Sequence, residues 1–134
     1  MEWLYAARGG SLSGGFNYSG SNNLDEVGWF YTNSEARSHL GGEKAPNELG
    51  LYDMSGNLWE WVWDIWSDGL PTGAQTDPTG PATGNLRACR SGSWGSYDYY
   101  CALNHRDRAA PTYVFFHMGL RVCRNSYNIP NRKL

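Results

Sequence analysis

"LYDMSGNLWEWVWDIW", residues 51–66, is the densest apolar stretch of the chain. Within it Trp59, Trp61 and Trp63 alternate with smaller or charged residues, and such alternation predicts a strand with one bulky face. We expect these tryptophans, together with Trp94, to lie in the core, because large aromatic side chains bury the most apolar surface. The stretch thus predicts one core strand, and the other elements are placed relative to it.

The flanking sequence predicts few regular elements. "MEWLYAARGG" (residues 1–10) is typical of a helix that ends at its glycine pair, since glycine readily takes left-handed backbone conformations. "LDEVGWFYTNSEA" (24–36) predicts one helical turn, and "LRACRSGSW" (86–94) and "GLRVCR" (119–124) predict short strands. The expected fold is therefore α+β and loop-rich, with short strands and few helices.

Size and charge limit the partners of this chain. Its 134 residues and 15.0 kDa suit one domain. A formal net charge of −2 and a pI near 5.8 argue against nucleic acid or an anionic membrane as the main partner. No apolar run approaches the roughly 18 residues of a membrane span, so no membrane insertion is expected. No signal peptide is visible either, which leaves the compartment open.

Residues 95–117, "GSYDYYCALNHRDRAAPTYVFFH", have a biased composition. They lack Lys, Glu, Gln, Met and Trp, which supply 19 of the other 111 residues. These five are the amino acids that no NNC codon encodes, and adenine-directed mutagenesis of the asparagine codon AAC produces NNC codons. Six aromatic residues also crowd the segment without alternation, as in binding loops. We interpret the segment as a diversified binding surface; the alternative is an ordinary loop that happens to lack five residue types.

Three motifs in the chain resemble those of a known family. "EWLYAARGG" (2–10), "NELGLYDMSGNLWEWVWDIW" (47–66) and "RSGSW" followed by "GLRVCR" (90–124) are similar, in this order, to segments of the formylglycine-generating enzyme (sulfatase-modifying factor) family. The resemblance covers nearly the whole chain and implies a C-type-lectin-like α+β fold, with residues 1–134 as a single domain. Family segments that precede the first motif have no counterpart here, so we expect a domain shortened at its N-terminus.

Some members of this family are copper-dependent oxidases that convert a substrate cysteine to formylglycine. In these enzymes two cysteines, the second and seventh residues after a "GGS-aromatic" motif, hold copper as a thiolate pair. Counting from Trp94, the seventh residue is Cys101, but the second is Ser96, whose hydroxyl is a hard, neutral ligand. We therefore expect no copper, no catalytic residues and no enzyme activity. The copper-dependent oxidase is kept as the alternative function.

Other members are non-enzymatic binding proteins, including the variable proteins of diversity-generating retroelements. Their variable regions resemble residues 91–122 in layout: "SGSW", a variable block, Cys101, "HR", a second block around Pro111, and "MGLRV". The resemblance implies a hypervariable surface at residues 95–117 that binds a protein or other macromolecule, at a cell surface or on a phage or virus particle. The expected ligand-binding residues are Ser96, Tyr97, Asp98, Tyr99, Tyr100, Leu103, His105, Asp107, Arg108, Thr112, Tyr113, Phe115, Phe116 and His117.

The stretch "YDMSGNLWEW" (52–61) matches a calcium site of the family. The resemblance implies a structural calcium ion held by the side chains of Asp53 and Glu60 and the backbone carbonyls of Gly56 and Leu58, which are hard oxygen ligands. A turn whose carboxylates only accept backbone hydrogen bonds is the other interpretation. Carbohydrate binding through calcium is a third, weaker function, because the chain lacks the EPN or QPD triplet of sugar-binding C-type lectins.

The chain contains three cysteines, so at most one intrachain disulfide can form. Cys89 and Cys123 lie in two predicted strands that we expect to be neighbours in a fold of this kind. Either they form a disulfide, which fits an extracellular setting, or both are buried free thiols. Cys101 is expected to pack as a small buried hydrophobic residue.

Overall fold

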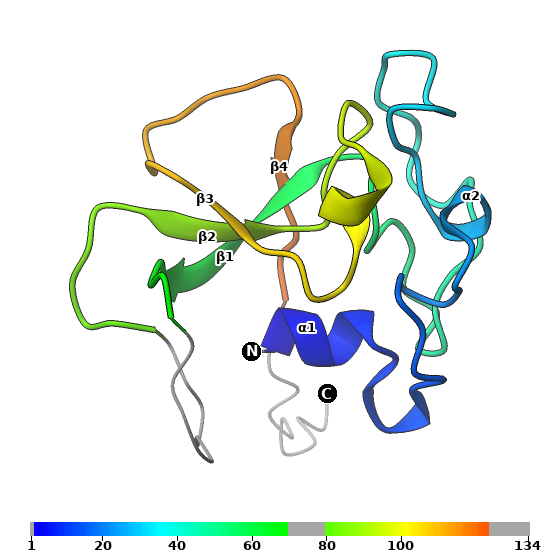
Figure 1. The fold of residues 1–134 in the computed structure, drawn as a ribbon, viewed down its shortest axis with the longest axis horizontal. Helices are drawn as coiled ribbons and strands as arrows, with labels where there is room; N and C mark the ends of the chain where they lie inside the picture. Colours follow the sequence, from blue (N-terminus) through cyan, green and yellow to red (C-terminus); the bar gives the residue numbers. More distant parts are fainter. Residues whose placement is uncertain (1, 70–79, 124–134) are drawn as a thin grey trace, which may run out of the picture.

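The computed structural model describes residues 2–69 and 80–123. In it two short α-helices and many loops surround one small sheet (Figure 1). The elements follow in the order α1 (Glu2–Ala7), η1 (Gly10–Leu12), α2 (Leu24–Val27), β1 (Trp59–Ile65), β2 (Arg87–Arg90), η2 (Asp98–Cys101), β3 (Asp107–Ala109) and β4 (Met118–Leu120). The fold is the α+β, loop-rich arrangement that the sequence predicts.

Local sequence explains both helices. The helix α1 stops where Gly9 and Gly10 take φ angles of 87° and 58°, a conformation that glycine adopts without steric cost. The helix α2 begins after Asn23, whose side-chain oxygen accepts a hydrogen bond from the backbone N–H of Asp25 at 3.2 Å. Such a cap satisfies a donor that the first turn leaves free. The predicted helical turn is thus confirmed.

The sheet has the order β3-β2-β1-β4, with β1 in an inner position. Strand β1 pairs antiparallel with β2 and parallel with β4, so that Trp59 lies opposite Met118. Strands were predicted at all three places; the last one starts and ends earlier in the chain than predicted, at Met118–Leu120. Strand β1 thereby brings the two ends of the segment 95–117 to one sheet.

The tryptophan prediction is only partly right. Trp59 is buried, with 7% of its surface exposed, but Trp63 is 79% exposed. Trp61 and Trp94 are half-buried. The register of β1 against β2 shifts between Trp61 and Ile65, and beyond the shift the guanidinium of Arg87 lies 4.7 Å from the ring centroid of Trp63. A cation over one ring face takes the place of core packing at Trp63.

The expectation that the strands of Cys89 and Cys123 are neighbours is wrong. Strand β1 lies between β2, which carries Cys89, and β4, which ends three residues before Cys123. Strands two positions apart are separated by roughly 10 Å, beyond the Cα–Cα reach of a disulfide. Both thiols are free, Cys89 buried and Cys123 exposed, so the alternative of two buried thiols holds for Cys89 alone.

Two small apolar clusters form the core of the described residues, and each contains a residue from the segment 95–117. Cys101 is 1% exposed and packs with Leu24, Val27 and Phe30, which confirms its expected burial. Leu103 packs with Ala7 and Met54. The segment 95–117 is therefore attached to the core at its middle, through Cys101 and Leu103.

Candidate ligand-binding surface

Residues 95–117 leave the sheet after β2 and return to it at β4. They form η2, the edge strand β3 and a long connection that arches away from α1 (Figure 1, yellow to orange). The most exposed part is the second half of this connection, where Val114 is 92% and Phe116 71% exposed. The segment thus covers one side of the sheet and presents its own side chains to solvent.

Backbone hydrogen bonds hold this segment on the scaffold. The Tyr31 N–H donates to the Ser96 carbonyl at 2.9 Å, the Leu103 N–H to the Asn17 carbonyl at 2.9 Å, and the Trp59 N–H to the His117 carbonyl at 2.9 Å. The Arg90 guanidinium adds a bond to the His105 carbonyl at 2.8 Å. None of these contacts uses a side chain of the segment, so its side chains can change while its backbone path is kept.

Two of the predicted ligand-binding residues point inward instead. Leu103 is 4% exposed and belongs to the core, because its position packs against Ala7 and Met54 from the N-terminal half. Ser96 is 8% exposed, and its hydroxyl accepts the Ser93 N–H at 3.0 Å. We therefore remove both from the exposed surface.

A first group of exposed rings, the tyrosine cluster, consists of Tyr31, Tyr97, Tyr99 and Tyr100. Ring centroids are 5.1 Å apart for Tyr31 and Tyr97, 6.2 Å for Tyr97 and Tyr99, and 4.2 Å for Tyr99 and Tyr100. A hydrogen bond with Tyr100, followed by smaller effects of burial and neighbouring charge, raises the pKa of Tyr99 to about 12. Tyr97 and Tyr99 are 54% and 55% exposed, so this cluster offers ring faces to a partner.

A second group, the phenylalanine cluster, consists of Trp94, Tyr113, Phe115, Phe116 and His117. The rings of Tyr113 and Phe115 stack at 5.3 Å, those of Phe115 and Phe116 at 4.5 Å, and Trp94 lies 5.6 Å from Phe116. Tyr113 and Phe115 are 46% and 37% exposed. Stacked rings at these separations stabilise each other in water-exposed loops.

Trp59 lies between the two clusters. Its ring is 6.2 Å from Tyr100 and its backbone N–H donates to the His117 carbonyl. Beside it is a hollow of about 280 Å³ that is also lined by Asp107, Arg108, Tyr113 and His117. The structure therefore brings together predicted binding residues from both variable blocks.

Two charged residues, Asp107 and Arg108, line this hollow, and further polar residues lie elsewhere on the surface. Arg108 pairs with Asp68 at 3.1 Å and its backbone N–H donates to the Asp107 carboxylate at 2.7 Å. Asp98 and Thr112 are exposed. The surface therefore carries both positive and negative charge, which contributes more to the specificity of binding than to its affinity.

Both histidines of the segment are partly buried. Burial lowers the pKa of His117. Burial lowers the pKa of His105 as well, Arg90 lowers it further, and Asp107 opposes the shift. The His105 Nε2 is buried without a hydrogen-bond partner among the described residues. Both rings are therefore neutral near pH 7 and serve as flat packing surfaces.

Sequence reasoning missed Tyr31, which is 59% exposed and extends the tyrosine cluster from outside residues 95–117. It also missed Trp66, whose ring lies 4.4 Å and 4.9 Å from the guanidinium groups of Arg106 and Arg108. No local pattern marks either residue, because both join the surface through contacts that only the fold creates.

Of the two positions that correspond to copper ligands, one carries the thiol of Cys101 and the other the hydroxyl of Ser96. Burial, and secondly the charge of Asp98, raise the pKa of Cys101 to about 12, so the thiol is protonated near pH 7. The Ser96 hydroxyl lies 3.0 Å from that of Ser93. Within residues 2–69 and 80–123, no three His, Cys, Asp or Glu side chains gather as a metal site.

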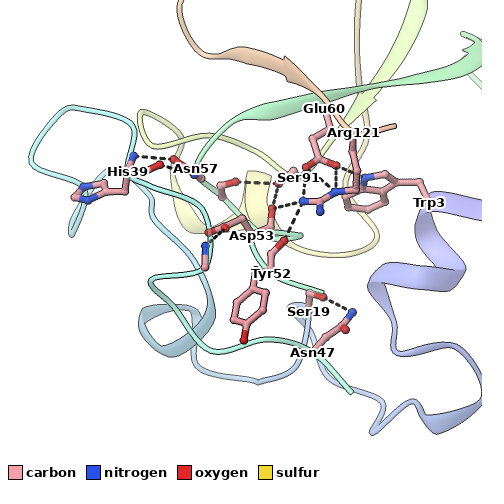
Figure 2. Close-up of polar contacts among 12 residues, drawn as sticks. Trp3, Ser19, His39, Asn47, Tyr52, Asp53, Asn57, Glu60, Ser91 and Arg121 are labelled. Carbon is pink, nitrogen blue, oxygen red and sulfur yellow. Dashed lines mark hydrogen bonds and ion pairs between the residues drawn. The ribbon is translucent and has the colours of Figure 1, made fainter. Parts of the chain in front are cut away.

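Three of the four expected calcium ligands, Asp53, Leu58 and Glu60, line a second hollow of about 710 Å³, together with Arg121 and others. Figure 2 shows that Arg121 reaches Glu60 and the backbone at Tyr52 and Asp53. The structure thus brings the predicted residues together and adds a cationic side chain that was not predicted to be there.

Comparisons with known proteins agree with this geometry. The solved structure of Treponema denticola variable protein 1 superposes with a TM-score of 0.81 at 37% identity, over 89% of this chain and 43% of that one. PvdO from Pseudomonas aeruginosa superposes with a TM-score of 0.65 at 29% identity, over 83% of this chain and 45% of that one. The fold is therefore the C-type-lectin-like fold of this family.

Curated relatives include "Chaperone protein LppX" of Paenibacillus barcinonensis, 33% identical over 92% of this chain and 47% of the relative. The formylglycine-generating enzyme of Streptomyces coelicolor is 35% identical over 75% of this chain and 36% of the enzyme. The chain spans less than half the length of these relatives. The profile of the sulfatase-modifying factor enzyme 1-like domain matches residues 1–126, and the chain belongs to that family.

Proposed function

We propose that this chain is a non-enzymatic ligand-binding protein whose residues 95–117 are diversified by a retroelement. Its partner would be a protein or other macromolecule, met at a cell surface or on a phage or virus particle. The main support is the exposure of Tyr97, Tyr99, Tyr113 and Phe115, at 54%, 55%, 46% and 37%, in a segment whose composition fits NNC codons. The likeness to Treponema denticola variable protein 1 favours the same class.

Ring chemistry supports a macromolecular partner. Tyrosine offers a large amphipathic contact area at a small cost in side-chain entropy, and clustered exposed aromatics commonly mark interaction sites. Nucleic acid is a poor candidate because the chain has a formal net charge of −2. Among the described residues no helix is long and apolar enough to cross a membrane.

The division between inward and outward positions supports diversification. Ser96, Cys101 and Leu103 are buried, and backbone hydrogen bonds hold the segment at Ser96, Leu103 and His117. A surface built in this way accepts new exposed side chains at little cost in stability, since surface substitutions usually change it by about 0.5 kcal/mol or less.

Two display libraries test the proposal. One varies Tyr97, Tyr99, Tyr113, Phe115 and Phe116 with NNC codons, and the matched library varies the buried Ser96, Cys101 and Leu103 in the same way. We expect folded, displayed protein from most clones of the first library and from few of the second. Panning the first library against lysozyme, as an arbitrary folded target, should then yield binders.

Equal loss of display in both libraries, or no binder from a well-displayed first library, would contradict a diversifiable surface. A near-identical, adenine-rich template beside a reverse transcriptase gene is the genomic expectation, and its absence would remove the retroelement from the proposal. Oxidation of a cysteine-containing peptide by the copper-loaded chain would instead support the oxidase alternative.

A further inference from the structure

Arg121 follows β4 directly and is surrounded by oxygen atoms (Figure 2). Its Nε donates to both carboxylate oxygens of Glu60 at 3.0 Å, and a terminal nitrogen reaches Glu60 Oε1 at 2.6 Å. The same nitrogen donates to the Tyr52 carbonyl at 2.9 Å and contacts the Asp53 carbonyl at 3.5 Å. One guanidinium thus faces three of the residues in the stretch 52–61.

Other internal donors engage three more oxygens of the expected calcium site. The indole N–H of Trp3 donates to Glu60 Oε2 at 2.7 Å. The Ser91 hydroxyl donates to the Gly56 carbonyl at 3.0 Å, and the Gly42 N–H donates to Asp53 Oδ2 at 2.8 Å. Asp53 Oδ1 is the one buried carboxylate oxygen here that has no partner among the described residues.

These contacts do not suit calcium. Calcium takes six to eight oxygen ligands at roughly 2.3–2.6 Å, and a single free carboxylate oxygen falls far short of that number even when the Leu58 carbonyl is added. A divalent ion close to Glu60 would also lie against the guanidinium, and like charges at such distances repel strongly in a partly buried site. Glu60 is 7% exposed, so its charge needs a partner, and Arg121 supplies one.

We propose that the Arg121 guanidinium is the resident cation of this site and takes the place that the family resemblance gives to calcium. A planar fork of donors is suited to a bidentate carboxylate and to nearby carbonyls at once. The contact joins Trp3 of α1, Glu60 of β1 and the exit of β4. It therefore fixes the chain four residues after His117, at the end of the variable segment, without a metal ion.

Thermal unfolding of three proteins, each with EDTA and with a millimolar excess of calcium chloride, tests this proposal. We expect the Tm of the unaltered chain to be the same in both solutions. Arg121→Gln should lower the Tm by about 10 °C or more, because it leaves Glu60 buried without its cation. The control Arg37→Gln, which breaks the exposed pair with Glu35, should leave the Tm within about 2 °C of the unaltered chain.

A calcium-dependent rise in the Tm of the unaltered chain would overturn the proposal, as would an Arg121→Gln variant as stable as the control. If that variant does not fold, calorimetric titration of the unaltered chain with calcium decides: heat from a stoichiometric site contradicts the proposal, and no heat supports it. These measurements involve no ligand of the aromatic surface. A result that contradicts the Arg121 proposal therefore leaves the proposed binding function unaffected.

Discussion

Leu103 and Tyr99 are four residues apart in one segment and have opposite surroundings. Leu103 is 4% exposed beside Ala7 and Met54, whereas Tyr99 is 55% exposed and its ring packs with those of Tyr97 and Tyr100. Cys101, between them, is buried in the other core cluster. At this scale the segment 95–117 is a mixture of buried and exposed positions.

The three cysteines should react in two classes. Burial raises the pKa of Cys89 and of Cys101 to about 12 in each case, while Cys123 is exposed. We expect iodoacetamide to modify one thiol per molecule in the native protein near pH 8 and all three after unfolding in urea, as measured by intact mass. Thiolate is the reactive form, so buried protonated thiols react slowly.

The variant Cys123→Ser is the control and should show no modification in the native state. A disulfide between Cys89 and Cys123 would appear as one modified thiol at most after unfolding without reductant. Rapid native modification at Cys101 would contradict its burial and would reopen the question of a metal-binding thiolate.

At the scale of elements, β1 serves two regions at once. Neighbouring residues of a strand point to opposite faces, so Trp59 contacts Tyr100 and His105 below the aromatic surface while Glu60 binds Arg121 on the other side. The pairing of β1 with β4 places His117 directly before and Arg121 directly after the three paired residues. One strand therefore supports both the proposed binding surface and the Arg121 site.

The turn after β2 depends on a glycine. Gly92 has φ of +69°, and a Cβ there would lie 2.6 Å from the Cys101 sulfur and 3.1 Å from the Cys101 backbone. Gly92→Ala should therefore lower the free energy of unfolding by at least about 1–2 kcal/mol, as measured by urea denaturation. A Cβ at Gly95 meets no atom within 4 Å, so Gly95→Ala is the matched control.

We expect Gly95→Ala to unfold at the urea concentration of the unaltered chain, within error. Equal midpoints for Gly92→Ala and Gly95→Ala would show that the close approach of Gly92 to Cys101 is absent in solution. A large loss of unfolding free energy in both variants would show instead that the backbone at Gly95 needs a glycine, although its surroundings have room for a Cβ.

At the scale of the whole molecule, stability should depend on pH through two histidines. The pKa values of His105 and His117 lie below their usual 6.5 in the folded chain, mainly through burial. Below about pH 6.5 the unfolded chain binds protons that the folded chain does not. The free energy of unfolding should therefore fall as the pH drops below about 6.5, and this fall ends below the folded pKa values.

Urea denaturation between about pH 7.5 and pH 5 measures this dependence. Carboxylates also titrate toward the acid end, so the double variant His105→Gln/His117→Gln is the reference. We expect its stability to change less over this range than that of the unaltered chain. Identical pH profiles would mean that neither histidine is desolvated by the fold.

Much of the fold follows from short stretches of sequence. The glycine pair after α1, the Asn23 cap of α2 and the alternation in β1 are local features, and each produced the predicted element. The candidate surface is also a continuous stretch of sequence. Its missing residue types and its crowded aromatics can be counted along residues 95–117, so its extent was predictable. Its binding role remains a proposal.

The family, the α+β class, the first helices and the extent of the candidate surface can all be predicted from the sequence, because these depend on neighbours in the chain. The folded chain was needed to show that Leu103 and Ser96 face inward, that Trp63 faces outward, that Tyr31 joins the tyrosine cluster and that β1 separates Cys89 from Cys123. It also placed Arg121 on Glu60, 61 residues away in the chain. Burial, strand order and ion pairing are set by contacts between distant segments, and the spacing of residues along the chain does not specify them.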